Sequence, residues 1–192
     1  MSNIYDCVNS FISLLNTRYH LILGRKGVSV SLQVEFTKND CFHLMGLQYL
    51  TDRPELKRNR AVIFDEIRDH IIKRDQIESS DFYPQICDRI RYLPMLEELF
   101  DKNDTIFKYN QKRNLYSMIE ADYLMKNKLE NRALYIFLSQ NKDGNYFCRS
   151  FFPETKMDYT KNQALWTLLY KSKIHVSNGE EIILYDRWNK NN

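Results

Sequence analysis

The first 36 residues change from the hydrophobic spacing of a helix to that of a strand. Apolar side chains recur at helical spacing in residues 3–15, which predicts a short amphipathic helix. Residues 19–23 form a short apolar run, and apolar and polar side chains alternate over residues 28–36. Between the two runs stands GRKG, residues 24–27, whose terminal glycines accept the backbone angles of a turn. The pattern therefore predicts a helix followed by a β-hairpin.

The next segment, residues 37–104, has a helical pattern. A polar residue at its start can cap a first helix, whose apolar positions run as far as Leu50. Apolar residues on one face and charges on the other predict a second helix over residues 62–72. A third helical stretch is predicted over residues 79–100, and Pro94 should kink or split it.

The last part of the chain is rich in aromatic residues. Three runs, residues 117–125, 133–139 and 146–152, are separated by polar turns and predict an antiparallel meander. Leucines at helical spacing predict a short helix over residues 160–172, and residues 181–186 predict a final strand.

These elements predict an α+β fold in which an antiparallel sheet packs against a helical segment. The sheet would combine the N-terminal hairpin with the C-terminal meander. No linker or internal repeat interrupts the pattern, so we expect one domain over residues 1–192. Its parts would be a helix and hairpin at 1–36, a helical segment at 37–104, and a sheet with one helix at 105–187.

The composition is that of a chain that folds around its own core. Of the 192 residues, 43% are hydrophobic and 14% aromatic, so neither disulfides nor a metal is needed for folding. The four cysteines (Cys7, Cys41, Cys87 and Cys148) are far apart and form no CxxC pair. This spacing argues against a zinc site and a disulfide framework, and we expect buried free thiols in a reducing, cytoplasmic compartment.

The net charge of +3 permits a nucleic-acid partner without requiring one. The N-terminus carries Asp6 early and does not have the pattern of a signal peptide. No window approaches the roughly 18 apolar residues that a bilayer span needs. We therefore expect no contact with a membrane.

Few residues have the spacing of a known catalytic motif. No glycine-rich phosphate loop, HExxH, GxSxG or EF-hand pattern is present. The adjacent carboxylate pairs Asp65–Glu66 and Glu97–Glu98 would point apart on helices, so metal catalysis has little support, and we expect no metal and no cofactor.

His43 is the most interesting of the four histidines, because it follows the hairpin's second strand and should lie in the first turn of the next helix. Its ordinary pKa of about 6.5 suits proton transfer near neutral pH. The alternative is a histidine packed on the helix and bonded to backbone.

Two further segments offer groups that suit a phosphate. Lys108 stands among aromatic residues before the meander and could stabilise phosphate charge, or could be a solvated lysine beside core aromatics. Arg149 and Ser150 end the third meander run, and Tyr159 precedes the predicted helix, so a cation and hydroxyl groups could gather there. A helix-capping role for the residues around Tyr159 is the alternative.

Taken in order, several segments resemble one family. They are FTKNDCFHLMGLQYLTD, FKYN, EADYL, CRSFFPE and DYTKNQ, the last followed by a leucine-rich stretch. The set is similar to the PBECR4-type family, the fourth type of phage nuclease-like domains related to barnase, EndoU, colicin tRNases and RelE. The resemblance covers roughly residues 19–185.

The resemblance implies a ribonuclease of phages and other mobile elements, with the fold described above. Related enzymes cleave RNA without a metal, through attack of the ribose 2′-OH on the adjacent phosphate. His43 would be the general base or acid, and Lys108 or Arg149 would stabilise the phosphorane charge. Ser150 and Tyr159 would position the phosphate or donate a proton.

The expected partner is RNA, such as tRNA or mRNA. If the protein is a toxin, a second expected partner is an antitoxin or inhibitor protein. An alternative is a catalytically inactive member of the fold that binds RNA or protein. A third class, a transferase that modifies proteins or nucleic acids, is also open.

Overall fold

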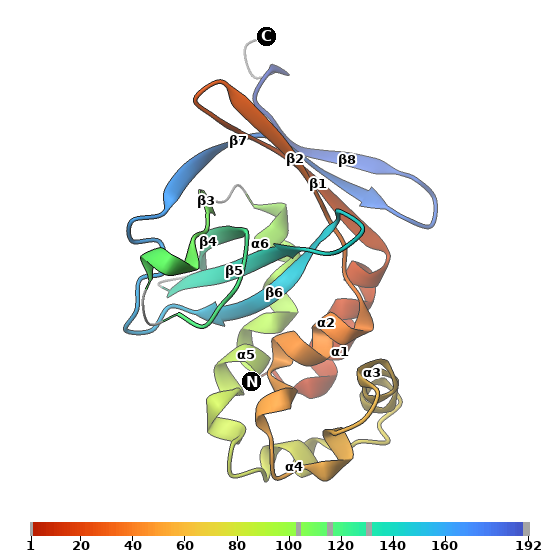
Figure 1. The fold of residues 1–192 in the computed structure, drawn as a ribbon. Helices are drawn as coiled ribbons and strands as arrows, with labels where there is room; N and C mark the ends of the chain where they lie inside the picture. The colour runs from red at the N-terminus through yellow and green to blue at the C-terminus, as the bar shows by residue number, and fades with distance from the viewer. Residues whose placement is uncertain (1, 103–104, 115–116, 130–131, 190–192) are drawn as a thin grey trace.

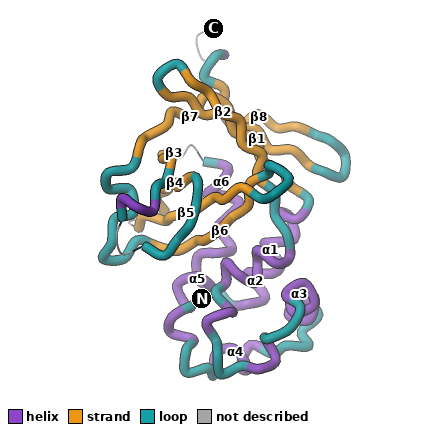
Figure 2. The backbone as a smooth tube through the Cα atoms, in the orientation of Figure 1, coloured by secondary structure: helices purple, strands orange, loops and turns teal. Residues whose placement is uncertain are grey.

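A computed structural model describes residues 2–102, 105–114, 117–129 and 132–189. In these residues the fold is α+β: strands close into a barrel, and most of the helices gather at one end of it (Figures 1 and 2). The helices are α1 (Ile4–Leu15), α2 (Lys38–Met45), α3 (Arg60–Arg68), α4 (Arg74–Glu78), α5 (Cys87–Tyr92) and α6 (Leu96–Asp101). The strands are β1 (Thr17–Arg25), β2 (Val28–Val34), β3 (Thr105–Lys108), β4 (Tyr123–Leu129), β5 (Arg132–Gln140), β6 (Tyr146–Pro153), β7 (Ala164–His175) and β8 (Glu181–Asp186).

The barrel closes because β7 is long enough to pair with two strands. Residues 167–175 pair with β1 and residues 164–166 with β3, both antiparallel. The order is β1-β2-β6-β5-β4-β3-β7 and back to β1, and β8 extends the sheet beyond β7. The contact between β2 and β6 is parallel and short: Val34 faces Tyr146, and the Glu35 amide donates to the Tyr146 carbonyl at 2.9 Å.

Every second side chain along a strand such as β1 points inward, and these apolar side chains fill the barrel. In β1, Tyr19, Leu21 and Leu23 are fully buried, whereas His20 and Ile22 between them are half-buried. This is the period of two that a strand with one buried face requires. The buried side chains form one cluster with the apolar faces of the helices, and each large apolar side chain in it contributes about 1.5–3 kcal/mol.

The opposite face of β4, β5 and β6 carries a second, smaller cluster. Its buried members are Tyr109, Leu124, Tyr135 and Phe137. Phe152 and Tyr159 pack against this cluster, so the segment after β6 folds back over the outside of the sheet. This outer face holds the polar groups described below.

The prediction of a helix over residues 160–172 is wrong: residues 164–172 belong to strand β7, and residues 160–163 precede it in a turn. Leu165 is 56% exposed, whereas Trp166 and Leu168 pack against the main core. Alternation, and not helical spacing, therefore decides the burial. The predicted sheet differs for the same reason: β7 joins β1 to β3, and the expected sheet of hairpin and meander becomes a closed barrel.

Other predicted elements hold with changed ends. The N-terminal helix, the hairpin, the β4–β5–β6 meander and the final strand are confirmed. β4 runs into the segment 126–132 that was expected to be a turn; residues 130–131 lie outside the described part of the chain. The stretch 79–100 is split at Pro94, as predicted, and further broken into short helical turns, while the helix expected over 62–72 ends at Arg68.

Three of the four cysteines are buried free thiols, as expected, but Cys87 on α5 is exposed.

Candidate active site

A β-bulge on β6 re-aims two of the predicted site residues. Phe137 of β5 lies opposite Ser150, and the next residue, Leu138, lies opposite Cys148. Arg149 is therefore an extra residue without a partner position on β5. Bulges bend a strand and turn side chains out of the regular alternation, and they are common beside active sites. Here the bulge leaves Arg149 exposed next to Ser150, which is 9% exposed.

Helix α2 brings His43 to the same strand. Thr37 and Asp40 form a capping box that starts the helix: each side chain accepts a hydrogen bond from the other residue's backbone N–H. Gly46 ends the helix in the left-handed conformation, with φ of 82°. His43 thus lies in the last turn of α2, not in the first turn as predicted, and its backbone carbonyl accepts from the Gly46 amide at 3.0 Å.

The surroundings of His43 favour its neutral form. Burial lowers the pKa of the imidazole below its usual 6.5, and the charges of Arg60, Arg149 and Arg89 lower it further. A hydrogen bond with the Arg149 backbone acts in the opposite direction. Nδ1 is buried and makes no hydrogen bond within the described residues. A neutral imidazole can accept a proton. His43 lies behind the bulge, however, and is not among the described residues that line two hollows beside that bulge.

Arg89 on α5 lies between two aromatic rings beside β6. One guanidinium nitrogen, Nη1, donates to the Phe151 carbonyl at 2.9 Å. The guanidinium carbon lies 5.6 Å from the centre of the Tyr49 ring and 5.4 Å from that of Phe152. Burial lowers the pKa of Arg89, but a guanidinium remains charged in proteins. Arg89 is therefore a cation held in place by contacts on several sides, with further donors for an anion.

A pocket of about 440 Å³ opens beside Arg89 on the outer face of the sheet. Its lining includes Ser150 and Tyr159, and on α5 and the turn before it Gln85, Asp88 and Arg89. Burial raises the pKa of Tyr159, so its phenol keeps its proton at neutral pH. The ring packs 5.3 Å from Phe152 and 5.4 Å from Tyr135 and Phe137, measured between ring centres.

A second hollow, of about 410 Å³, lies on the other side of the bulge. Arg149 lines it together with two carboxylates, Glu120 and Asp122. The segment 118–122 contributes to both hollows, and Arg149 and Ser150 are neighbours in the chain. The bulge therefore separates two adjoining depressions on one face, with an arginine available to each.

Lys108 is placed apart from the pocket beside Arg89, next to the Asp122 carboxylate that lines the second hollow. Its ammonium lies 3.5 Å from an Asp122 carboxylate oxygen and 4.2 Å above the centre of the Tyr123 ring. Tyr123 belongs to the main core, whereas Phe107, the neighbour of Lys108 on β3, packs on the outer cluster. Lys108 therefore faces away from the pocket lined by Arg89, Ser150 and Tyr159.

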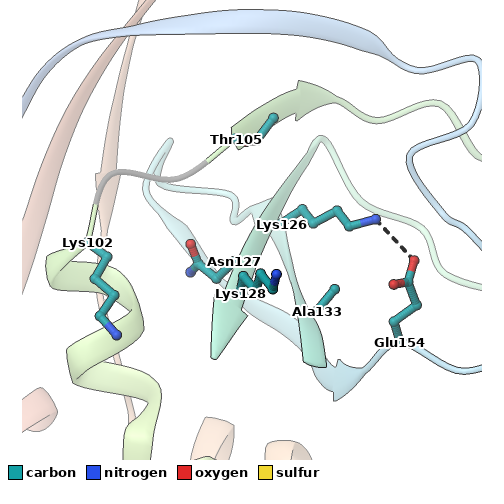
Figure 3. Close-up of a pocket in the computed structure, with 7 residues that line it drawn as sticks. All are labelled: Lys102, Thr105, Lys126, Asn127, Lys128, Ala133 and Glu154. Carbon is teal, nitrogen blue, oxygen red and sulfur yellow. Dashed lines mark hydrogen bonds and ion pairs between the residues drawn. The ribbon is translucent and has the colours of Figure 1, made fainter. Parts of the chain in front are cut away.

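A third pocket, of about 520 Å³, lies between β4 and the ends of α6, β3 and β6 (Figure 3). Lys126 points at Glu154 there, with 3.0 Å between Nζ and Oε1, and lies 3.7 Å from Asp158. The Tyr135 hydroxyl donates to both carboxylates. The lining holds three lysines, of which Lys126 is paired with these two carboxylates and Lys102 lies 2.6 Å from Glu98. Two of the three positive charges of this pocket are therefore already neutralised by carboxylates.

Sequence reasoning missed Arg89, Asp88 and Tyr49. A usable signal was present, since Gln85, Asp88 and Arg89 are spaced i, i+3 and i+4, which places them on one face of a helix. The prediction for residues 79–100 considered only the apolar positions of the helix.

Neither metal ligation nor a membrane span is apparent in the described ranges. No three His, Cys, Asp or Glu side chains of these residues are grouped to hold a metal ion. None of the described helices combines the length and the apolar content that crossing a bilayer requires.

The chain matches one family of known proteins over most of its length. The chain is a nuclease-like α+β protein: a family model described as phage-Barnase-EndoU-ColicinE5/D-RelE like nuclease 4 (PBECR4) matches residues 3–187. Because the match spans nearly the whole chain, the protein belongs to this phage-associated family. No curated protein and no solved structure matches it.

Proposed function

We propose that the protein is an endoribonuclease that cleaves RNA without a metal ion, in the pocket beside Arg89. The observation that carries the proposal is the placement of three kinds of group around one bulge of β6. Arg89 and the protonated Tyr159 phenol line one pocket there, and the exposed Arg149 lines the adjoining hollow. The neutral His43 imidazole is hydrogen-bonded to the Arg149 backbone beside them. Membership in a nuclease-like family supports the same reaction class.

The proposed reaction needs only these groups. The His43 imidazole takes the proton of a ribose 2′-OH, and the 2′ oxygen attacks the adjacent phosphorus. The bond from phosphorus to the 5′ oxygen breaks, and that oxygen takes the proton of the Tyr159 phenol. The products are a 2′,3′-cyclic phosphate and a free 5′-OH. A base and an acid placed in this way typically contribute about 10²–10⁴-fold each.

The arginines would stabilise the charge that develops on the phosphate. Arg89 is fixed by its bond to Phe151 and by the Tyr49 and Phe152 rings, so little reorganisation is needed when the negative charge grows. Arg149 is exposed and can reach a phosphate that crosses the bulge. The Ser150 hydroxyl would orient that phosphate.

The wider setting follows from the family and is part of the proposal. The substrate would be tRNA or mRNA in the cytoplasm of a bacterium that carries the gene on a phage or another mobile element. An antitoxin or inhibitor protein would then restrain the activity.

The decisive experiment measures cleavage of total RNA and purified tRNA with EDTA present. We expect cleavage by the wild type and a loss of about 10²–10⁴-fold in His43→Ala and in Tyr159→Phe. His70→Asn is the matched control, because His70 is exposed and lies just beyond α3. Asp88→Asn tests the other proton acceptor in the pocket lining. Equal cleavage by wild type and His43→Ala, with loss in Asp88→Asn, would move the base to Asp88.

Absence of cleavage by the wild type would refute the proposal. If RNA still bound under those conditions, the chain would be an inactive RNA-binding member of the family.

A further inference from the structure

A cationic pocket lies at the tip of the β1–β2 hairpin, away from the pocket beside Arg89. Its volume is about 400 Å³, and it is lined by residues 24–29 of the hairpin tip, by Thr167 and Leu169 of β7, and by Arg187. Three of these side chains are cations, and none of the described residues in the lining carries a carboxylate. The tip and the chain after β8 lie at the end of the molecule opposite α1–α5 (Figure 1).

The hairpin tip has a defined conformation. Arg25 faces Val28 across a two-residue turn, and both turn residues have left-handed backbone angles, with φ of 50° at Lys26 and 79° at Gly27. Such turns match the twist of the strands and hold them in register. Gly24 lies so close to β7 that an added Cβ would be 2.7 Å from a methyl carbon of Leu169. The cations of the tip are therefore carried on a frame packed against β7.

An exposed tryptophan stands next to the pocket. Trp188 follows Arg187 in the chain and is 58% exposed. Its ring is stacked on Tyr170 of β7, with ring centres 6.4 Å apart and planes inclined by 23°. The Trp188 amide donates to the Asp186 carboxylate at 2.9 Å, which orients the backbone after β8. One face of a large ring is thus supported by protein, and a planar ligand could stack on the ring.

We propose that this end of the barrel binds a single-stranded segment of RNA, with phosphates on Arg25, Lys26 and Arg187 and a base on Trp188. Cations that follow a phosphate backbone, combined with an aromatic ring that stacks a base, are the features by which proteins hold single strands. The inference deepens the proposed ribonuclease function, because it gives the substrate a second point of contact remote from the cleavage pocket. Short substrates would reach only the cleavage pocket.

The test uses a ligand that the proposed reaction cannot cleave. A fluorescently labelled 2′-O-methyl RNA of about 12 nucleotides, long enough for an extended single-strand site, lacks the attacking hydroxyl. Its affinity is measured over a range of salt concentrations. In the variant Arg25→Gln/Lys26→Asn/Arg187→Gln, the slope of log affinity against log salt should fall by about 2, because each lost phosphate contact accounts for about 0.7. Trp188→Ala should weaken binding by about tenfold or more, since stacking of one base is worth about 1–3 kcal/mol.

The matched control removes the same charge elsewhere. Lys57, Lys73 and Lys142 are exposed, and none lines this pocket. Changing all three to glutamine should leave the salt slope within about 0.5 of the wild-type value if the effect is local. Equal losses in the two triple variants would overturn the inference.

Two further measurements separate this inference from the proposed function. Cleavage of a dinucleotide, which fills only the pocket beside Arg89, should proceed at the wild-type rate in the hairpin variant. Loss of 2′-O-methyl RNA binding by that variant would support the second site even if the wild type cleaved nothing. Titration of the wild type with the unlabelled 2′-O-methyl RNA should quench the tryptophan emission, and Trp188→Phe should lose that quench while Trp166 remains. No quench in the wild type would overturn the stacking on Trp188, whether or not the triple variant folds.

Discussion

Replacing Gly46 with alanine tests how the end of α2 is packed against α5. Gly46 has φ of 82°, a left-handed angle that costs a residue with a Cβ about 1–2 kcal/mol. The added Cβ would also lie 2.8 Å from a methyl carbon of Ile86 and 2.9 Å from the Cδ of Arg89. Both distances are below ordinary contact, so at least one of these side chains must move.

The expected loss of stability combines the two effects. Overpacking of this kind costs about 1–3 kcal/mol in addition to the backbone strain. The free energy of unfolding should therefore fall by about 2–5 kcal/mol, which lowers the melting temperature by about 4–20 °C for a chain of this size. A displaced Arg89 should also reduce RNA cleavage at temperatures where the variant is still folded.

The measurement is urea and thermal unfolding followed by circular dichroism, with Gly179→Ala as the control. Gly179 also has a left-handed angle, with φ of 73°, but a Cβ there would meet nothing within 4 Å. The control should lose only the strain of about 1–2 kcal/mol. Equal losses in the two variants would show that Gly46 is needed for its backbone angle alone, and the packing argument would be wrong.

Three other predictions concern the helix, the histidine and a buried ion pair. Thr37→Ala should lower the unfolding free energy by about 1 kcal/mol, because it removes the cap of α2; an unchanged urea midpoint would contradict this. Because the pKa of His43 is lowered in the folded protein, the imidazole of the unfolded chain binds a proton at a higher pH than that of the folded chain. The stability gained by keeping His43 neutral is therefore complete above pH of about 6.5 and is lost as the pH falls below that value. His43→Gln should flatten that part of the curve of unfolding free energy against pH. Lys173→Met should cost about 1–3 kcal/mol, because the Lys173 ammonium lies 2.6 Å from Glu97 and 3.1 Å from Asp101, both partly exposed; a melting temperature equal to that of the wild type would refute it.

Where a local pattern had a single interpretation, the sequence predicted the element. The alternation in β2 and the helical spacing in α1 reflect one buried face, and the proline at position 94 interrupts a helix whatever surrounds it. The failure at β7 has a clear cause. Leu165, Leu168 and Leu169 fit a helix by spacing, but the chain there pairs with β1 and β3, and those partners are remote in sequence. Local spacing cannot rank a helix against a strand whose hydrogen bonds are supplied by distant segments.

The candidate site divides in the same way. The sequence by itself indicated His43, Lys108, Arg149, Ser150 and Tyr159 as candidate groups. It predicted the helix that carries His43 and the strand that carries Arg149 and Ser150, but it predicted a helix directly after Tyr159 where the chain forms a turn and strand β7. Only the tertiary structure decided which groups meet: a single extra residue in β6 turns Arg149 outward, and packing of α5 brings Arg89 to the pocket. The physical reason is that residue chemistry and periodicity are local properties, whereas strand register, bulges and helix packing depend on contacts between segments far apart in the chain.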